Sequence, residues 1–201
     1  GVRVHYDYLV IALGSETNFF GLQNVEKHSF TMKTLADALS LRNRLIDMLE
    51  QAENETREEL KQRLLTFVVV GGGFAGVETA GEINDFLHDA LNYYHNINKV
   101  DINVIIIEAL SSILPGFNKK LVKFAHNKLE KNGIKILLDT IVSSFDGKIV
   151  IVKKSAKSTS TVKSKIIIPS YTLVWAAGVT PVEIIKKSIF KTMKGQIIVN
   201  E

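Results

Sequence analysis

The sequence predicts an α/β fold, and three features of its hydrophobic pattern support that prediction. Short apolar, β-branched runs alternate with longer segments in which apolar residues recur every three or four positions, as in strands alternating with amphipathic helices. The order in the middle of the chain is β-α-β-α-β, which favours a parallel sheet with helices on its faces. Beyond residue 138, short strands separated by turn residues predict an antiparallel β-meander.

One strand and two helices are expected before the parallel sheet. Residues 6–13 (YDYLVIAL) form an apolar run stopped by Gly14, which is typical of a buried strand. From residue 34 to residue 52 the apolar side chains follow helical spacing. The sequence Thr56-Arg-Glu-Glu59 then matches a capping box, so a second, short helix is expected to begin there. We interpret these two helices as a connector.

The remaining elements follow in chain order. The parallel sheet is expected from strands at residues 67–70, 102–107 and 134–138, with helices after the first two. The second of these helices runs from Asn118 to Asn132, with an Asn at its start and Gly133 after its end. The meander is expected from strands at 141–145, 148–152 and 166–168, and a last buried strand at 171–177 ends at Gly178.

Composition excludes several classes of protein. The 201 residues are 46% hydrophobic and 23% charged with three prolines, which is typical of a globular chain and excludes disorder and collagen-like repeats. No run reaches the roughly 18 consecutive apolar residues of a membrane span. The absence of cysteine excludes a disulfide scaffold and a cysteine nucleophile within these residues, and the five histidines lack metal-ligand spacing. The chain starts at Gly1 without a signal segment, so we expect a fragment.

Charge is distributed unevenly along the chain. The formal net charge is +4, but residues 147–201 contain ten lysines and two glutamates, so this part carries +8 and the rest −4. The lysines are not interleaved with aromatic residues, so we expect no nucleic-acid partner. A solvated basic face is one interpretation of this tail, and attraction to an anionic membrane surface is the other.

A glycine-rich turn provides the strongest functional signal. Gly71-Gly72-Gly73-Phe74-Ala75-Gly76 satisfies G-x-G-x-x-G directly after a predicted strand and at the start of a predicted helix. In such a turn the first glycine allows the tight bend, the second lets a pyrophosphate approach the backbone, and the third lets helix and strand pack closely. The helix N-terminus then favours the phosphate charge. We therefore predict a Rossmann-like βαβαβ sheet whose cofactor-binding residues include these six, the alternative being a glycine-rich turn without a ligand.

Two glutamates are candidates for contacts with the bound nucleotide. Glu108 ends the second strand, where an acid accepts hydrogen bonds from ribose hydroxyls, and its charge favours NAD(H) over NADP(H). The alternative is an exposed glutamate at the start of a loop. Glu78 lies in the first turn of the helix, where its charge complements the helix dipole. The same position lets Glu78 contact the nicotinamide end or act catalytically in proton handling.

Segments spread over nearly the whole chain resemble the type II NADH dehydrogenases, flavoproteins with two dinucleotide-binding domains. The resemblance lies in five segments, namely YDYLVIALGSETNFFG, TLADALSLRNRLIDMLEQA, LLTFVVVGGGFAGVETAGEI, VIIIEALSSILPGF and TLVWAAGVTP. It implies a remnant of an FAD-binding domain at 1–30, a helical connector at 31–64, an NAD(H)-binding domain at 65–181 and a return to the FAD-binding domain at 182–201. It further implies that Ala12 and Gly14 contact FAD and that Ala177 and Gly178 line the NADH cleft.

The function implied by the resemblance is that of an NADH:quinone oxidoreductase of a respiratory chain. Hydride would pass from NADH to FAD, and electrons would pass on to quinone. The resemblance also implies a cytoplasmic enzyme peripheral to the membrane, with a homodimer as one possible state, and we expect the isolated 201 residues to be inactive. Two alternatives stay open: a flavoenzyme with another electron acceptor, and a noncatalytic NAD(H)-binding or redox-sensing module. Thioredoxin reductases are disfavoured because their redox cysteines belong in this domain.

Overall fold

The computed structural model describes residues 2–155, 165–193 and 196–199 and divides into two compact units. The larger unit runs from Phe19 to Ala177, and the smaller one combines the segments before and after it. Both helices that were expected as a connector lie within the larger unit. The assignment of the flanking segments to an FAD-binding domain stays a prediction.

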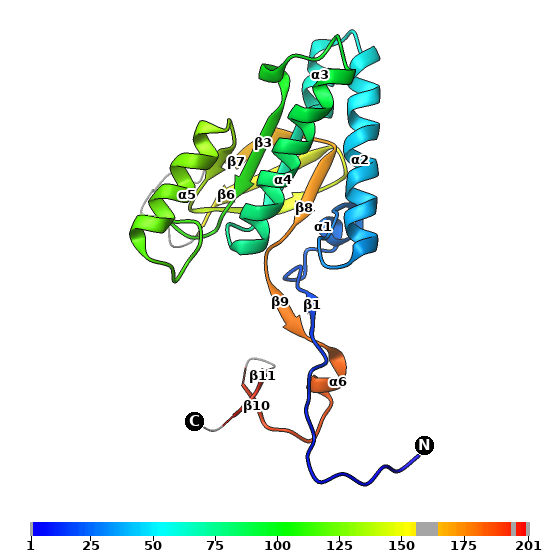
Figure 1. Ribbon diagram of the computed structural model, residues 1–201, viewed down its shortest axis with the longest axis vertical. Helices are drawn as coiled ribbons and strands as arrows, with labels where there is room; N and C mark the ends of the chain where they lie inside the picture. Colours follow the sequence, from blue (N-terminus) through cyan, green and yellow to red (C-terminus); the bar gives the residue numbers. More distant parts are fainter. Residues whose placement is uncertain (1, 156–164, 194–195, 200–201) are drawn as a thin grey trace. The chain divides into compact units, whose positions relative to one another are not determined.

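A four-stranded parallel sheet forms the centre of the larger unit (Figure 1). Its order is β4-β3-β2-β8, with bounds Lys135–Leu137, Asn103–Ile107, Thr66–Val70 and Thr172–Trp175. The crossovers run through α4 (Phe74–Ala90) and α5 (Lys119–Lys131), and two 3-10 turns, η1 (Leu91–Tyr93) and η2 (Lys99–Asp101), follow α4. The predicted β-α-β-α-β order is thereby confirmed.

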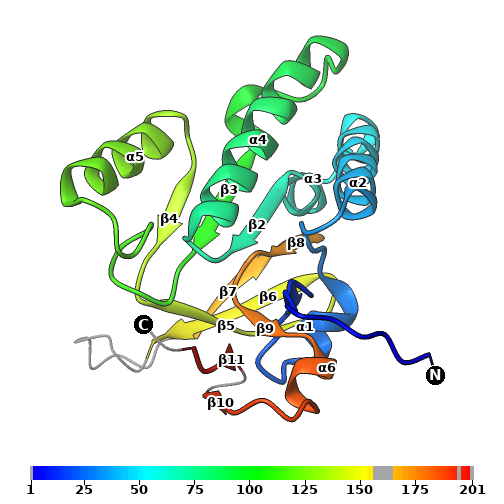
Figure 2. The same cartoon turned by 60° about the horizontal axis from the view of Figure 1, so that its bottom comes forward.

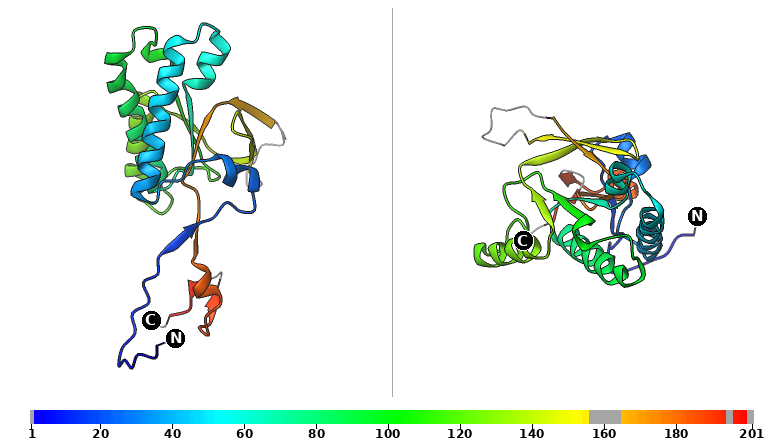
Figure 3. Two further views of the ribbon diagram at one scale, coloured as in Figure 1. Left: turned by 90° about the vertical axis from the view of Figure 1, so that its right-hand side faces the viewer. Right: turned by 90° about the horizontal axis from the view of Figure 1, so that it is seen from above.

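Helices cover one face of this sheet, and the meander covers the other (Figure 2). The helix layer holds α2 (Leu35–Asn54), α3 (Glu58–Leu64), α4 and α5, and α2 lies beside α4 (Figure 3). In β2, Phe67 and Val69 pack toward the helices, whereas Val68 and Val70 pack toward the meander. Because both faces are buried, the strands read as continuous apolar runs rather than as alternating ones.

The predicted antiparallel meander is also confirmed. It consists of β5 (Thr140–Phe145), β6 (Ile149–Lys154) and β7 (Lys165–Pro169), in that order. Asp146 accepts hydrogen bonds from the backbone amides of Lys148 and Ile149, which lower the pKa of its carboxyl group and fix the first turn. The Ser/Thr/Lys-rich segment between β6 and β7 lies outside the described residues.

The capping box lies at a different helix from the one predicted. At α2 the Thr34 side chain accepts from the Asp37 amide, and Asp37 accepts from the Thr34 amide. The prediction of a box at Thr56 is wrong, because α3 begins after Arg57, which makes no side-chain cap. Glu55 instead accepts hydrogen bonds from the side chain and backbone of Arg57, which lower its carboxyl pKa to about 2. Glu55, rather than Thr56, thus makes the side-chain hydrogen bonds that fix the chain just before α3.

The outer edge of β8 is paired with a residue from the N-terminal part of the larger unit. Phe30 forms a parallel bridge with Val174, its amide donating to Leu173 O (2.8 Å) and its carbonyl accepting from Trp175 N (2.7 Å). Just before it, α1 (Gln23–His28) buries Val25 among the meander residues. Val25 and Phe30 therefore attach residues 19–34 to the larger unit.

The smaller unit has little regular structure among its described residues. β1 (Ser15–Thr17) pairs with β9 (Val179–Pro181), β10 (Thr192–Met193) pairs with β11 (Gln196–Ile197), and α6 spans Glu183–Lys186. The prediction of a buried strand at residues 6–13 is wrong, since these residues form no strand and their side chains are exposed. A buried strand needs hydrogen-bonded neighbours and apolar cover, and the run finds neither among the described residues.

Candidate dinucleotide-binding site

The register of the parallel sheet brings three chain segments to one edge. Val70 pairs with both Ile107 and Trp175, so that β2, β3 and β8 end side by side. The next residues along the chain, Gly71 and Glu108 among them, therefore emerge at the carboxyl edge of the sheet. Open α/β sheets bind their ligands at this edge.

Gly71 and Gly76 are required by the packing of the turn itself. Gly71 has φ +110°, and an ideal Cβ there would lie 2.9 Å from the carbonyl oxygen of Ala176 at the end of β8. A Cβ on Gly76 would lie only 1.8 Å from the carbonyl oxygen of Gly71. The first turn of α4 thus rests directly on the backbone of the bend, as the spacing of the motif predicts.

Gly73 differs from these two glycines because open space surrounds it. Its φ of −73° suits any residue, and an ideal Cβ would meet no atom within 4 Å. Gly73 is also the N-cap of α4, and because glycine has no side chain to cap the helix, the first backbone N–H groups of this 17-residue helix are left for another acceptor. The packing around residue 73 does not itself require glycine. A glycine at this helix start is therefore best explained by a pyrophosphate that approaches the backbone there.

Glu108 is fixed against the glycine turn. Its side chain is 8% exposed, Oε2 accepts from the Gly72 amide (2.5 Å), and Oε1 accepts from the Leu110 amide (2.8 Å). The Gly72 carbonyl in turn accepts from the Leu114 amide (2.7 Å), which anchors the loop after β3 to the same turn. The carboxylate is therefore buried and oriented by backbone donors, and the alternative of an exposed glutamate does not hold.

A cavity of about 360 Å³ lies at this carboxyl edge within the larger unit. Three expected site residues line it, namely Gly71, Glu108 and Ala177. Thr140 and Lys153 from the meander also line it, and so does the buried Trp175 of β8. Sequence reasoning missed the two meander residues, and their only signal is that Thr140 comes three positions after the last residue of β4.

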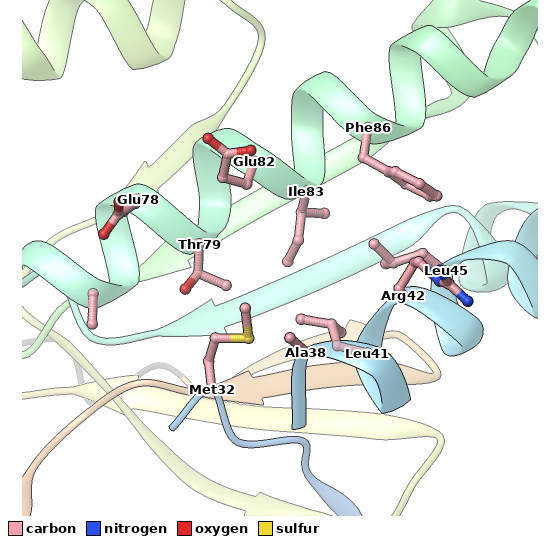
Figure 4. Close-up of a pocket in the computed structure, with 11 residues that line it drawn as sticks. Met32, Ala38, Leu41, Arg42, Leu45, Glu78, Thr79, Glu82, Ile83 and Phe86 are labelled. Carbon is pink, nitrogen blue, oxygen red and sulfur yellow. The ribbon is translucent and has the colours of Figure 1, made fainter. Parts of the chain in front are cut away.

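Glu78 lies in a second cavity, between α2 and α4, of about 510 Å³ (Figure 4). Ala75 lines it as well, and apolar side chains from both helices face one another across it, among them Leu41, Leu45 and Ile83. Glu78 and Glu82 lie one helical turn apart on α4. Of the expected site residues in the larger unit, Gly71, Glu108 and Ala177 line the first cavity and Ala75 and Glu78 line the second. Gly72, Gly73, Phe74 and Gly76 line neither cavity, a separation that the sequence does not predict.

The residues expected to contact FAD lie in the smaller unit. Ala12 and Gly14 line a cavity of about 310 Å³ together with residues of β9. Gly178 has φ +77°, and its carbonyl accepts a hydrogen bond from the Asn18 amide (3.3 Å). Their contacts with a cofactor stay predictions.

No helix in the described part of the chain has both the length and the apolar character needed to cross a bilayer.

Comparison with known proteins agrees with the fold and the glycine turn. The model of the pyridine nucleotide-disulphide oxidoreductase family matches residues 1–201. The chain is 35% identical over 204 aligned residues to the external alternative NADH-ubiquinone oxidoreductase of Yarrowia lipolytica, covering 99% of this chain and 35% of that protein. It is 36% identical to the type II NADH:quinone oxidoreductase Ndh of Mycobacterium tuberculosis, covering 87% of this chain and 37% of that protein.

Among solved structures, NDH2 from Plasmodium falciparum in complex with NADH superimposes with a TM-score of 0.82 at 30% identity, over 92% of this chain and 37% of that one. The chain thus spans roughly a third of the length of these relatives. The expected resemblance to type II NADH dehydrogenases is confirmed, and the chain belongs to the pyridine nucleotide-disulphide oxidoreductase family.

Proposed function

We propose that the chain forms the NADH-binding part of a flavin-dependent NADH:quinone oxidoreductase. The observation that supports this proposal most directly is the open, uncapped start of α4 at Gly73, next to a buried carboxylate at the end of β3. The names of the relatives, which include NADH and quinone or ubiquinone, favour the same activity.

Each part of the site has a defined task in this proposal. The backbone amides at Gly73 and the first turn of α4 hold the pyrophosphate. Glu108 accepts hydrogen bonds from the adenosine ribose hydroxyls, and its negative charge disfavours a 2′-phosphate. Lys153 lines the same cavity and offsets part of this repulsion, so we expect NADH to be preferred without NADPH being fully rejected.

The proposed interactions with flavin, quinone and membrane concern the full-length protein. Bound FAD would supply the acceptor for the hydride of NADH and the donor of electrons to quinone. We propose that Ala12 and Gly14 contact FAD and that Glu78, in the first turn of α4, lies at the nicotinamide end, where it orients the ring or holds a proton. Because quinones dissolve in lipid, we also propose peripheral association with a membrane. Assembly as a homodimer stays a prediction.

Isothermal titration of the chain with NADH tests the nucleotide site. Gly73→Ala is expected to weaken NADH binding about 10- to 100-fold, because a methyl group would keep the phosphate from charged hydrogen bonds worth roughly 1.5–3 kcal/mol. Gly81→Ala is the matched control, since it also adds a methyl group in open space on α4 but lies outside the turn. Equal NADH affinity of both variants would overturn the proposed site.

A further inference from the structure

Helix α5 carries apolar side chains on two faces. Leu129, Val122 and Ala125 pack into the core under the helix layer. Leu121 and Phe124 are 59% and 70% exposed, and Phe117 just before the helix is 45% exposed. Leu121 and Phe124 lie three residues apart and therefore on one side of the helix, and Phe117 lies just before its first turn. The helix therefore presents an apolar stripe that the described chain does not cover.

The stripe continues to the start of α4. Phe74 is 64% exposed, and its ring meets that of Phe117 edge to face with centroids 4.7 Å apart. α5 lies at the margin of the helix layer, on the side away from α2, in both views of Figures 1 and 2. We call the three side chains Phe117, Leu121 and Phe124 the α5 stripe, and Phe74 of the glycine turn borders it.

Lysines flank the α5 stripe on a single short helix. Five exposed lysines lie on α5, namely Lys119, Lys120, Lys123, Lys128 and Lys131. None of them forms an ion pair within the described residues. The one acidic residue of the helix, Glu130, lies 3.4 Å from the ring nitrogen of His126. Five lysines against one glutamate give α5 a formal charge of +4.

We propose that the α5 stripe and its lysines bind an anionic lipid surface, with the helix lying in the plane of the headgroups. Exposed Phe and Leu beside Lys are the composition of helices that lie in this plane, where the apolar side chains enter the acyl boundary and the lysines attract acidic lipids. The cores of protein–protein interfaces are instead depleted of lysine. None of the cavities described above is lined by α5 residues.

This inference rests on the proposed function and specifies it, because it names the surface through which the NADH-binding part approaches the membrane that contains the quinone. It also differs from the interpretation in which the tail at residues 147–201, rather than α5, is attracted to the membrane surface. The lysines of α5 lie outside that tail, in the part of the sequence whose net charge is negative. The net charge of −4 for residues 1–146 therefore does not reveal the basic surface of α5.

Sedimentation of the chain with vesicles tests the inference. Vesicles of phosphatidylcholine and phosphatidylserine in a three-to-one ratio are expected to bind the chain, and vesicles of phosphatidylcholine alone to bind it weakly. Lys120→Glu/Lys123→Glu and, separately, Leu121→Ser/Phe124→Ser are expected to lower the partition coefficient about tenfold or more. Lys148→Glu/Lys154→Glu, which changes exposed lysines of the tail, is the matched control and is expected to retain binding.

Three results would overturn the inference. These are unchanged vesicle binding by both α5 variants, loss of binding in the tail variant alone, and a chain dimer in sedimentation velocity that the α5 variants abolish. NADH affinity is measured on every variant and is expected to stay unchanged, because the altered residues lie outside the nucleotide site. A chain that binds vesicles through α5 but fails to bind NADH would refute the proposed function and leave the membrane surface intact.

Discussion

Replacing Gly76 by alanine tests the most crowded contact of the glycine turn. The ideal Cβ would lie 1.8 Å from the Gly71 carbonyl oxygen, whereas real Cβ atoms essentially never approach within 3.0 Å. The start of α4 and the bend would therefore have to separate by about 1.2 Å. Because Gly71 also lies against the end of β8, the bend cannot retreat without disturbing a second strand.

The expected cost follows from this displacement. Forcing an extra methyl group into a packed region costs typically about 1–3 kcal/mol and occasionally more. Here the obstacle is backbone, so we expect destabilisation at the upper end, about 3 kcal/mol. The gain in helix propensity of about 1 kcal/mol from replacing glycine offsets only part of the strain.

Urea unfolding followed by far-UV circular dichroism measures the difference. Gly81→Ala serves as the control, because Gly81 lies in the same helix and its Cβ would meet no atom within 4 Å. That variant is expected to be more stable than the parent by up to about 1 kcal/mol. If Gly76→Ala matched Gly81→Ala in stability, α4 would not rest on the bend, and the reasoning about the turn would be refuted.

Three further predictions concern single side chains. In Glu108→Gln, the side-chain NH2 group faces the backbone N–H of Gly72 or of Leu110, so one buried hydrogen bond is lost and urea unfolding should show a loss of about 1–3 kcal/mol. Titration should also show a smaller preference for NADH over NADPH, and an unchanged preference would contradict the role of Glu108. Thr34→Ala removes the capping box of α2, and thermal unfolding should show a loss of about 1 kcal/mol, which Lys33→Ala should not reproduce. Burial, and secondarily Lys99, lowers the pKa of His88 below 6.5, so its neutral form is favoured in the folded state. Stability should be full above pH 6.5 and fall as the pH drops through 6.5 toward the lower folded-state pKa, and His88→Gln should flatten this dependence; an equally steep profile in the variant would count against it.

The sequence predicts the parallel sheet well because its strands are buried on both faces. Burial of this kind leaves an uninterrupted apolar run, such as residues 67–70, that local pattern alone identifies. The same reasoning fails at residues 6–13, where an equally apolar run forms no strand. Local composition reports the tendency to be buried, but a strand also requires a partner that lies far away in the chain.

The site is predictable to the extent that it is local. The glycine spacing and the acid at the end of β3 belong to short segments, and the structure brings Gly71 and Glu108 to one cavity. Lys153 reaches that cavity through the meander, 45 residues beyond Glu108, and no spacing rule indicates it. The hydrogen bond from Gly72 to Glu108 is equally non-local, since it depends on the register between β2 and β3.

The bridge formed by Phe30 has a consequence for the solution behaviour of the chain. An unpaired outer strand offers a row of free N–H and C=O groups on which another molecule can build, and aggregation starts readily from such an edge. At β8, Phe30 occupies the groups of Leu173 and Trp175 that would otherwise serve as this template. One residue that belongs to no regular strand therefore removes part of the template that this edge would offer to another molecule.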